Sequence, residues 1–167
     1  MCMADGLQNL LNGVAFLESH RLLIGIPEAE SARSGPITNV QLAFIHTNGS
    51  PRMHIPARPF LEPGINGAET KEKITGCMKQ AILCALSGDT GGAEAEMEKA
   101  GLYGQKAAQS MIGSGALAAN APITVDGGWI RNPVSGKPVH IEGKGSSAPL
   151  IDTGSLRQAI TYVVEGS

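Results

Sequence analysis

The sequence predicts an α+β fold, and three observations lead to this prediction. Apolar residues recur at helical spacing in residues 5–19, 68–86 and 93–112. Two short apolar runs, residues 21–26 and 159–164, have the length and composition of strands. Between the last predicted helix and the last strand the periodicity fades, and Gly, Pro, Ser and Lys accumulate. This composition predicts a long irregular insertion near the C-terminus.

The composition limits both the core and the class of partner. A chain of 167 residues fits one domain, and 42% hydrophobic residues suffice for its core. Aromatic residues make up only 4%, so the core must consist of Leu, Ile, Val, Ala and Met. The formal net charge is −2, whereas free-standing DNA-binding domains usually carry a basic surplus. We therefore expect neither specific DNA binding nor electrostatic attraction to a membrane.

The cysteines and the N-terminal residues indicate a protein that folds in a reducing cytoplasm. Three cysteines form no disulfide framework. Cys77 and Cys84 lie seven residues apart on one face of a predicted helix, which favours two small buried thiols over a metal site. No basic region precedes a long apolar run, and no apolar stretch reaches 18 residues. We expect no signal peptide, no transmembrane helix and no cofactor.

Two segments have features that suit another structure or interrupt a regular helix. Residues 37–46 have apolar positions that suit a helix face, but their alternation also suits a strand, and we favour the helix. In residues 93–112, Gly101 and Gly104 interrupt the helix at a cost of about 1 kcal/mol each relative to alanine. Glycines in such positions predict close packing of the helix.

Residues 55–61 (IPARPFL) form a stiff segment. Pro56 and Pro59 each push the preceding residue out of the helical region, which keeps the backbone extended. Alternatively, Pro59 is the first residue of a short helix that contains Phe60. Arg58 lies between the two prolines. It either pairs with an acidic group of a neighbouring subunit, because a stiff backbone presents it at low entropic cost, or is an ordinary surface arginine.

Asp152-Thr153-Gly154 follows two apolar residues, as in the signature of aspartic proteases. Those enzymes need a flap and a further sheet after the motif, and only 13 residues follow Gly154 here. We favour a structural role for the motif. In that role Asp152 or Thr153 caps a helical turn over residues 155–158, Gly154 permits the tight backbone geometry, and Leu156 points into the core.

Several short blocks combine into a pattern that resembles a known family. The strongest are Ile55-Pro56-Ala57-Arg58-Pro59-Phe60-Leu61 and Pro149-Leu150-Ile151-Asp152-Thr153-Gly154-x-Leu156-Arg157, followed by Ile160-Thr161-Tyr162. Weaker ones are Ala43, Ile45, His46 and Gly49, then Asn120-Ala121-Pro122-Ile123-Thr124 and Lys144-Gly145-Ser146. Over residues 36–164 the chain resembles the virion morphogenesis and tail-completion (head–tail joining, neck) proteins of long-tailed bacteriophages.

The resemblance implies a single domain over residues 1–167, with a small, mostly antiparallel sheet flanked by helices. We expect a flexible loop at about residues 127–148, part of which looks like an insertion relative to the family. The chain also departs from the family in His46-Thr47-Asn48-Gly49, where relatives commonly have Glu before the turn glycine. Any contact that this Glu makes in relatives is therefore not expected here.

The function that the resemblance implies is structural rather than enzymatic. Six copies are expected to form a ring in the virion neck, in contact with a portal adaptor or stopper, the tail terminator and the tail tube. DNA would pass through the lumen without specific binding. The residues expected to serve as interface or structural motif are Ile55, Pro56, Arg58, Pro59, Phe60, Asp152, Thr153, Gly154, Leu156 and Arg157.

Three other functions compete with the neck ring. A tail terminator would cap the tail tube in the same virion. An aspartic-type peptidase would use Asp152. A bacterial binding module would have no relation to phage.

Overall fold

The computed structural model describes residues 2–33, 36–51, 55–145 and 154–166, with side chains from residue 6 onward. The elements follow in the order α1 (Cys2–Ser19), β1 (His20–Gly25), the 3-10 turn η1 (Glu28–Glu30), α2 (Asn39–Asn48), α3 (Leu61–Asn66), α4 (Ala68–Leu86), α5 (Thr90–Gly113), α6 (Pro122–Asp126), β2 (Gly128–Arg131), β3 (Pro138–Ile141), α7 (Ser155–Ala159) and β4 (Thr161–Gly166). The α+β prediction is confirmed, with two small antiparallel sheets rather than one.

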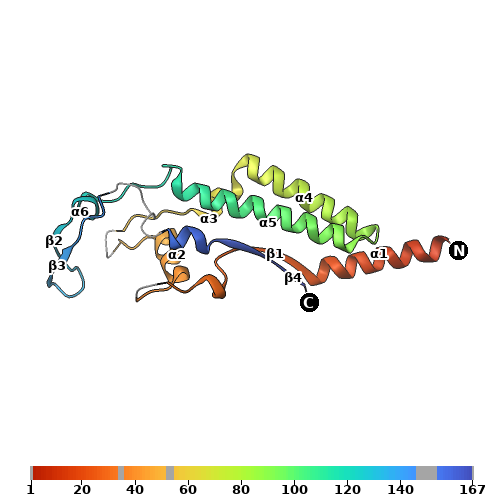
Figure 1. Cartoon of the computed structure of the whole chain (residues 1–167), viewed down its shortest axis with the longest axis horizontal. Helices are drawn as coiled ribbons and strands as arrows, with labels where there is room; N and C mark the ends of the chain where they lie inside the picture. The colour runs from red at the N-terminus through yellow and green to blue at the C-terminus, as the bar shows by residue number, and fades with distance from the viewer. Residues whose placement is uncertain (1, 34–35, 52–54, 146–153, 167) are drawn as a thin grey trace.

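The molecule is elongated, with a helical body between two protruding ends (Figure 1). The helices α4 and α5 pack side by side in the body, and α1 extends beyond them at one end. The unit formed by α6, β2 and β3 lies at the opposite end.

The strands β1 and β4 form an antiparallel ribbon that joins segments from opposite ends of the sequence. Leu22 lies opposite Val164 and Ile24 opposite Tyr162, and this inner face packs on α5. Leu23 lies opposite Val163 on the outer face, where both side chains are exposed. The alternation of buried and exposed residues follows from the two-residue repeat of a strand.

The close approach of α5 to this ribbon depends on two glycines. A Cβ atom on Gly101 would lie 2.3 Å from Cδ2 of Tyr162, and one on Gly104 would lie 2.4 Å from Cδ1 of Ile24. The predicted close packing at both positions is therefore confirmed. The neighbour that makes it necessary is the β1–β4 ribbon.

The core has two parts, which lie at different levels along α5. One contains Phe60, Ala108, Ile112, Leu156 and Ile160. The other contains Ala81, Ala85, Ala93 and Met97, at the contact between α4 and α5. Small side chains at the helix contact bring the helix axes close together, so an interior poor in aromatic residues can still be tightly packed.

The segment predicted at residues 37–46 contains the helix α2, Asn39–Asn48, rather than a strand, as favoured. The helix α2 begins after Thr38, whose side chain accepts a hydrogen bond from the backbone N–H of Gln41. The Gln41 side chain accepts one from the N–H of Thr38 in return, which completes a capping box. This cap selects the helical alternative, because it satisfies backbone donors only at a helix N-terminus.

The flexible loop expected at about residues 127–148 contains regular structure, so that expectation needs correction for the described part. The strands β2 and β3 pair with Trp129 opposite His140. The Asn132 side chain accepts hydrogen bonds from the backbone N–H groups of Val134 and Ser135, which closes the turn. Turn-forming residues dominate the composition of this segment, so the sequence pattern did not reveal the two strands, which have four residues each.

Replacing Gly101 by alanine is expected to lower the free energy of unfolding by about 1–3 kcal/mol, because the new methyl group overlaps the Tyr162 side chain. Gly76→Ala is the matched control. Gly76 lies inside α4, and a Cβ atom added there would have no neighbouring atom within 4 Å, so alanine should stabilise the protein by up to about 1 kcal/mol. Urea unfolding measures both changes, and equal effects at the two sites would contradict the packing argument.

Candidate docking site

The two strongest blocks of the family resemblance meet in one core. Phe60 from the first block is 1% exposed, and Leu156 and Ile160 from the second are 3% and 0% exposed. All three pack with Ala108 and Ile112 of α5. The expected inward position of Leu156 is confirmed, whereas its neighbour Arg157 is exposed. The two blocks therefore support each other and together form the base of a surface described below.

Arg58 is buried, which contradicts the expectation of a surface arginine. Only 6% of the residue is exposed. Its Nε donates a hydrogen bond to the carbonyl oxygen of Ala118 at 2.6 Å, and its Nη2 donates one to Ala119 at 2.8 Å. The partners of Arg58 in the structure are therefore two backbone carbonyls of its own chain, and not an acidic group of a neighbouring subunit. Burial lowers the pKa of the guanidinium, although an arginine remains cationic at neutral pH.

The role of Arg58 is to tie the extended block to the segment that leads into α6. Residues 118–119 lie in a stretch without regular structure, so their carbonyls have no helix or sheet to bond to. A planar guanidinium satisfies two of them at once. The start of the unit at the far end of the molecule is thereby fixed to the core.

The rest of the proline block precedes α3 and has no helix of its own. Ile55 forms an isolated bridge with Ser50, with N–H to carbonyl distances of 2.8 and 3.0 Å in the two directions. Pro56 and Pro59 are exposed. The helix α3 begins at Leu61 with Phe60 as its N-cap, so Pro59 precedes the helix and is not its first residue.

Gly154 has a φ of 76° and occupies the N-cap position of α7. This left-handed conformation confirms that glycine is needed for the turn. The N-cap position of α7 is occupied by Gly154, whereas the prediction named Asp152 or Thr153 as the capping residue. Those two residues lie outside the described part of the chain, so neither the structural nor the peptidase hypothesis for Asp152 is tested.

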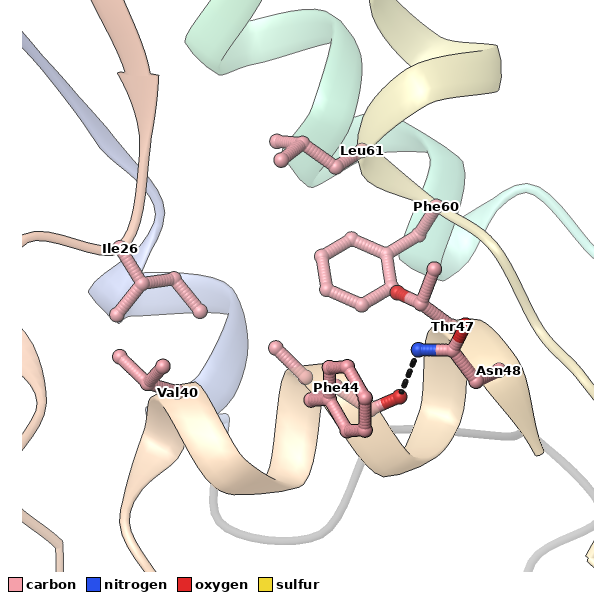
Figure 2. A pocket seen from close by; sticks show the side chains of 8 residues that line it. Ile26, Val40, Phe44, Thr47, Asn48, Phe60 and Leu61 are labelled. Carbon is pink, nitrogen blue, oxygen red and sulfur yellow. Dashed lines mark hydrogen bonds between the residues drawn. The ribbon is translucent and has the colours of Figure 1, made fainter. Parts of the chain in front are cut away.

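Above this core, the outer face of α2 borders an apolar groove of about 220 Å³ (Figure 2). Phe44 and Val40 rise from α2 along one wall, and Phe60 and Leu61 face them from the α3 side. Phe44 is 69% exposed and Val40 43% exposed. The groove is lined by Ile26, Val40, Ala43, Phe44, Thr47, Asn48, Phe60 and Leu61.

The size and the lining of the groove indicate what it can accommodate. Small-molecule sites usually enclose about 300–1,000 Å³ and include a few polar groups that orient the ligand. This groove is smaller, and none of its lining residues is charged. It suits an apolar side chain of a partner protein better than a substrate. The sequence pattern placed Phe44 on an apolar helix face, but it could not show that this face is left uncovered.

His46 lies at the end of α2 in cationic surroundings. Burial lowers its pKa from 6.5 to about 4, with further contributions from Arg58, Lys144 and Arg33. Its Nδ1 is buried and has no hydrogen-bond partner among the described residues. Its backbone carbonyl accepts a 2.6 Å hydrogen bond from the N–H of Arg58. The neutral imidazole therefore belongs to the same junction as Arg58.

No protein-family model, curated protein or solved structure matches the chain. Within the described residues, no three His, Cys, Asp or Glu side chains gather as metal ligands would. None of the described helices combines the length and the apolar character needed to cross a membrane. The groove on α2 is thus the candidate site with the clearest geometry.

Arg58→Met should lower the free energy of unfolding by about 1.5–3 kcal/mol, because two carbonyls lose a charged donor. It should also speed proteolytic cleavage within residues 114–121. Arg157→Met is the control, since Arg157 is exposed and its replacement should change stability by at most about 0.5 kcal/mol. Similar unfolding midpoints for the two variants would show that the clamp contributes nothing.

His46 should make stability depend on pH between 6.5 and about 4. Because its pKa is lower in the folded protein than in the unfolded chain, the unfolded chain binds more protons in this range. Stability should therefore fall as the pH falls through this window. The His46→Gln variant should lose this part of the dependence. Urea unfolding at a series of pH values tests it, and identical pH profiles would refute the assignment.

Proposed function

We propose that this chain is a structural subunit of the neck of a long-tailed bacteriophage, where it forms a ring that completes the tail or joins it to the capsid. The observation that carries the proposal is the exposed apolar groove on α2, which rests on a core made by both blocks of the family resemblance. A structural subunit needs a docking surface of fixed shape, and this arrangement supplies one.

The exposed apolar side chains support a role in assembly. Single apolar residues on a surface are normal, whereas contiguous groups mark contacts with other proteins. Phe44 and Val40 form such a group on α2, and a second group lies on α1. Phe44 is 69% exposed beside an open groove, and aromatic residues such as phenylalanine are enriched at protein interfaces.

The same proposal accounts for the charge. In a neck ring the DNA passes through the lumen and must not be held there. A subunit with a net charge of −2 offers little attraction to phosphates. The partners in this proposal are further copies of the chain, a portal adaptor or stopper, the tail terminator and the tail tube.

Deletion of the gene from a phage that encodes this chain should yield filled heads and tails that fail to join, as seen by negative-stain electron microscopy. Wild-type protein supplied in trans should restore joining. Phe44→Asp should not, because a charged side chain blocks an apolar docking surface, while its high exposure leaves the fold intact. Leu102→Asp, at an exposed position on α5 outside the groove, is the control that should restore joining.

The deletion also separates the neighbouring hypotheses. Tails of abnormal length would indicate a tail terminator. Complete, infectious particles without the protein would refute both virion roles. Circular dichroism of each variant establishes that the loss of joining does not come from unfolding.

A further inference from the structure

The two ends of the molecule carry opposite charge. We define the acidic end as α1 and residues 87–98, which comprise the α4–α5 turn and the start of α5. These segments contain Asp5, Glu18, Asp89, Glu94, Glu96 and Glu98 and no Lys or Arg. They lie together, because a Cβ atom on Gly13 would be 2.2 Å from the carbonyl oxygen of Ala85, and Gly88 contacts Asn9.

Part of this negative charge is available to a partner. Asp89 accepts a hydrogen bond from the N–H of Gly92 as the N-cap of α5, and Glu96 pairs with Lys99. Glu18, Glu94 and Glu98 are exposed. Glu94 and Glu98 are four residues apart on α5 and so lie on one side of that helix.

An apolar stripe accompanies the charge. Leu7, Leu10, Leu11 and Val14 of α1 follow helical spacing and are 40% to 62% exposed. The sequence pattern predicted this stripe, and these exposed fractions show that the described part of the chain leaves much of it uncovered. Most of the stability of a helix in a protein comes from packing of its apolar face, so a contact along these leucines would stabilise α1.

The opposite end carries positive charge. The β2–β3 hairpin, residues 128–141, contains Arg131 and Lys137 and no Asp or Glu, and the adjoining residues of the same unit add Asp126, Glu142 and Lys144, which leaves a small positive excess. It belongs to a unit that folds on itself, since the N–H groups of Lys144 and Gly145 bond to the carbonyls of Thr124 and Val125. An isolated two-stranded hairpin is barely stable in water, so this end also gains from a partner.

The hairpin presents an aromatic and a cationic side chain on one face. Trp129 and Arg131 are two residues apart on β2, opposite His140 and Pro138. Trp129 is 71% exposed, with its ring edge-on to His140 at 5.1 Å between centroids. Trp and Arg are enriched among the residues that dominate binding energy.

We propose that the chain associates head to tail, with the β2–β3 hairpin of one copy bound to the acidic end of the next. The two surfaces lie at opposite ends of the elongated molecule, so they cannot meet within one copy (Figure 1). They are complementary in charge, and each has apolar side chains to bury. Such a heterologous contact closes into a ring when the rotation between copies allows it.

The placement of this contact in a virion ring rests on the proposed function, whereas the contact itself does not. The hairpin alone has the composition of a weak nucleic-acid ligand, with two basic residues and one tryptophan. A second copy is favoured as the occupant because its acidic end offers the exposed carboxylates of Glu18, Glu94 and Glu98 to the hairpin, whereas the net charge of −2 of the whole chain disfavours binding to phosphates.

Charge reversal at each end tests the proposal by sedimentation velocity of the purified full chain. Arg131→Glu with Lys137→Glu should weaken self-association about tenfold or more, and so should Glu94→Lys with Glu98→Lys, because each places like charges in contact. An equimolar mixture of the two double variants should associate again, since one complementary pair of surfaces is regained. Lys71→Glu with Lys79→Glu makes the same charge change on α4 and should leave association unchanged.

Several outcomes would overturn the proposal. These are a wild-type chain that stays monomeric at low ionic strength, double variants that associate like the wild type, and a mixture that shows no recovery. Hairpin variants that lose binding to double-stranded DNA but keep self-association would assign the hairpin to nucleic acid instead. Recovery in the mixture together with absence of the protein from virions would retain the contact and refute the neck function. The reverse result would retain the neck function and refute the contact.

Discussion

The structure depends on how closely the β1–β4 ribbon approaches α5. Two glycines and several alanines on that helix remove the side chains that would hold the layers apart. Within the described residues the ribbon has two strands, and a sheet of that size is not stable by itself. Its inner residues Leu22, Ile24, Tyr162 and Val164 are sheltered because α5 lies against them. Since the chain has few aromatic residues, closeness rather than bulk makes this interior dense.

A second constraint is the cation buried under the surface of α2. Removing a charge from water costs several kcal/mol, and two short charge-assisted hydrogen bonds offset part of this cost for Arg58. The same residue holds the base of the far unit and contributes to the lowered pKa of His46. Arg58 thus holds three segments together, namely the proline block, the end of α2 and residues 118–119. The groove above them has a fixed shape because its base is fixed.

The local elements could be predicted from the sequence, because each has a signal within a few residues. The helix expected at residues 68–86 has those bounds in the structure, and the capping residues of α2 explain why it is a helix. Gly101 and Gly104 indicated close packing, although the neighbour could not be named. The predictions that failed concern contacts between residues far apart in the sequence. The sequence indicated a surface position for Arg58 because its partners, Ala118 and Ala119, are backbone groups that leave no trace in composition.

The β2–β3 hairpin was not predicted, for a different reason. Strands of four residues are too short to show a clear alternation of apolar and polar residues when turn residues surround them. The candidate docking site was only half predictable. The blocks at residues 55–61 and 149–162 contribute Phe60, Leu156 and Ile160 to one core, yet the exposed surface belongs to α2, which rests on that core. A sequence pattern identifies an apolar face, but only the packed structure shows whether another part of the chain covers it.

The pairing of β1 with β4 has a consequence for the order in which the protein matures. During synthesis β1 leaves the ribosome early, and its partner follows only after α5 and the hairpin have been made. Until then the glycine-containing side of α5 has no ribbon to cover it, and the open edge of β1 is free to pair with another chain. The last step of folding therefore covers the glycine-containing side of α5 and pairs one edge of β1, and a nascent chain stalled before residue 161 would leave both of these surfaces open.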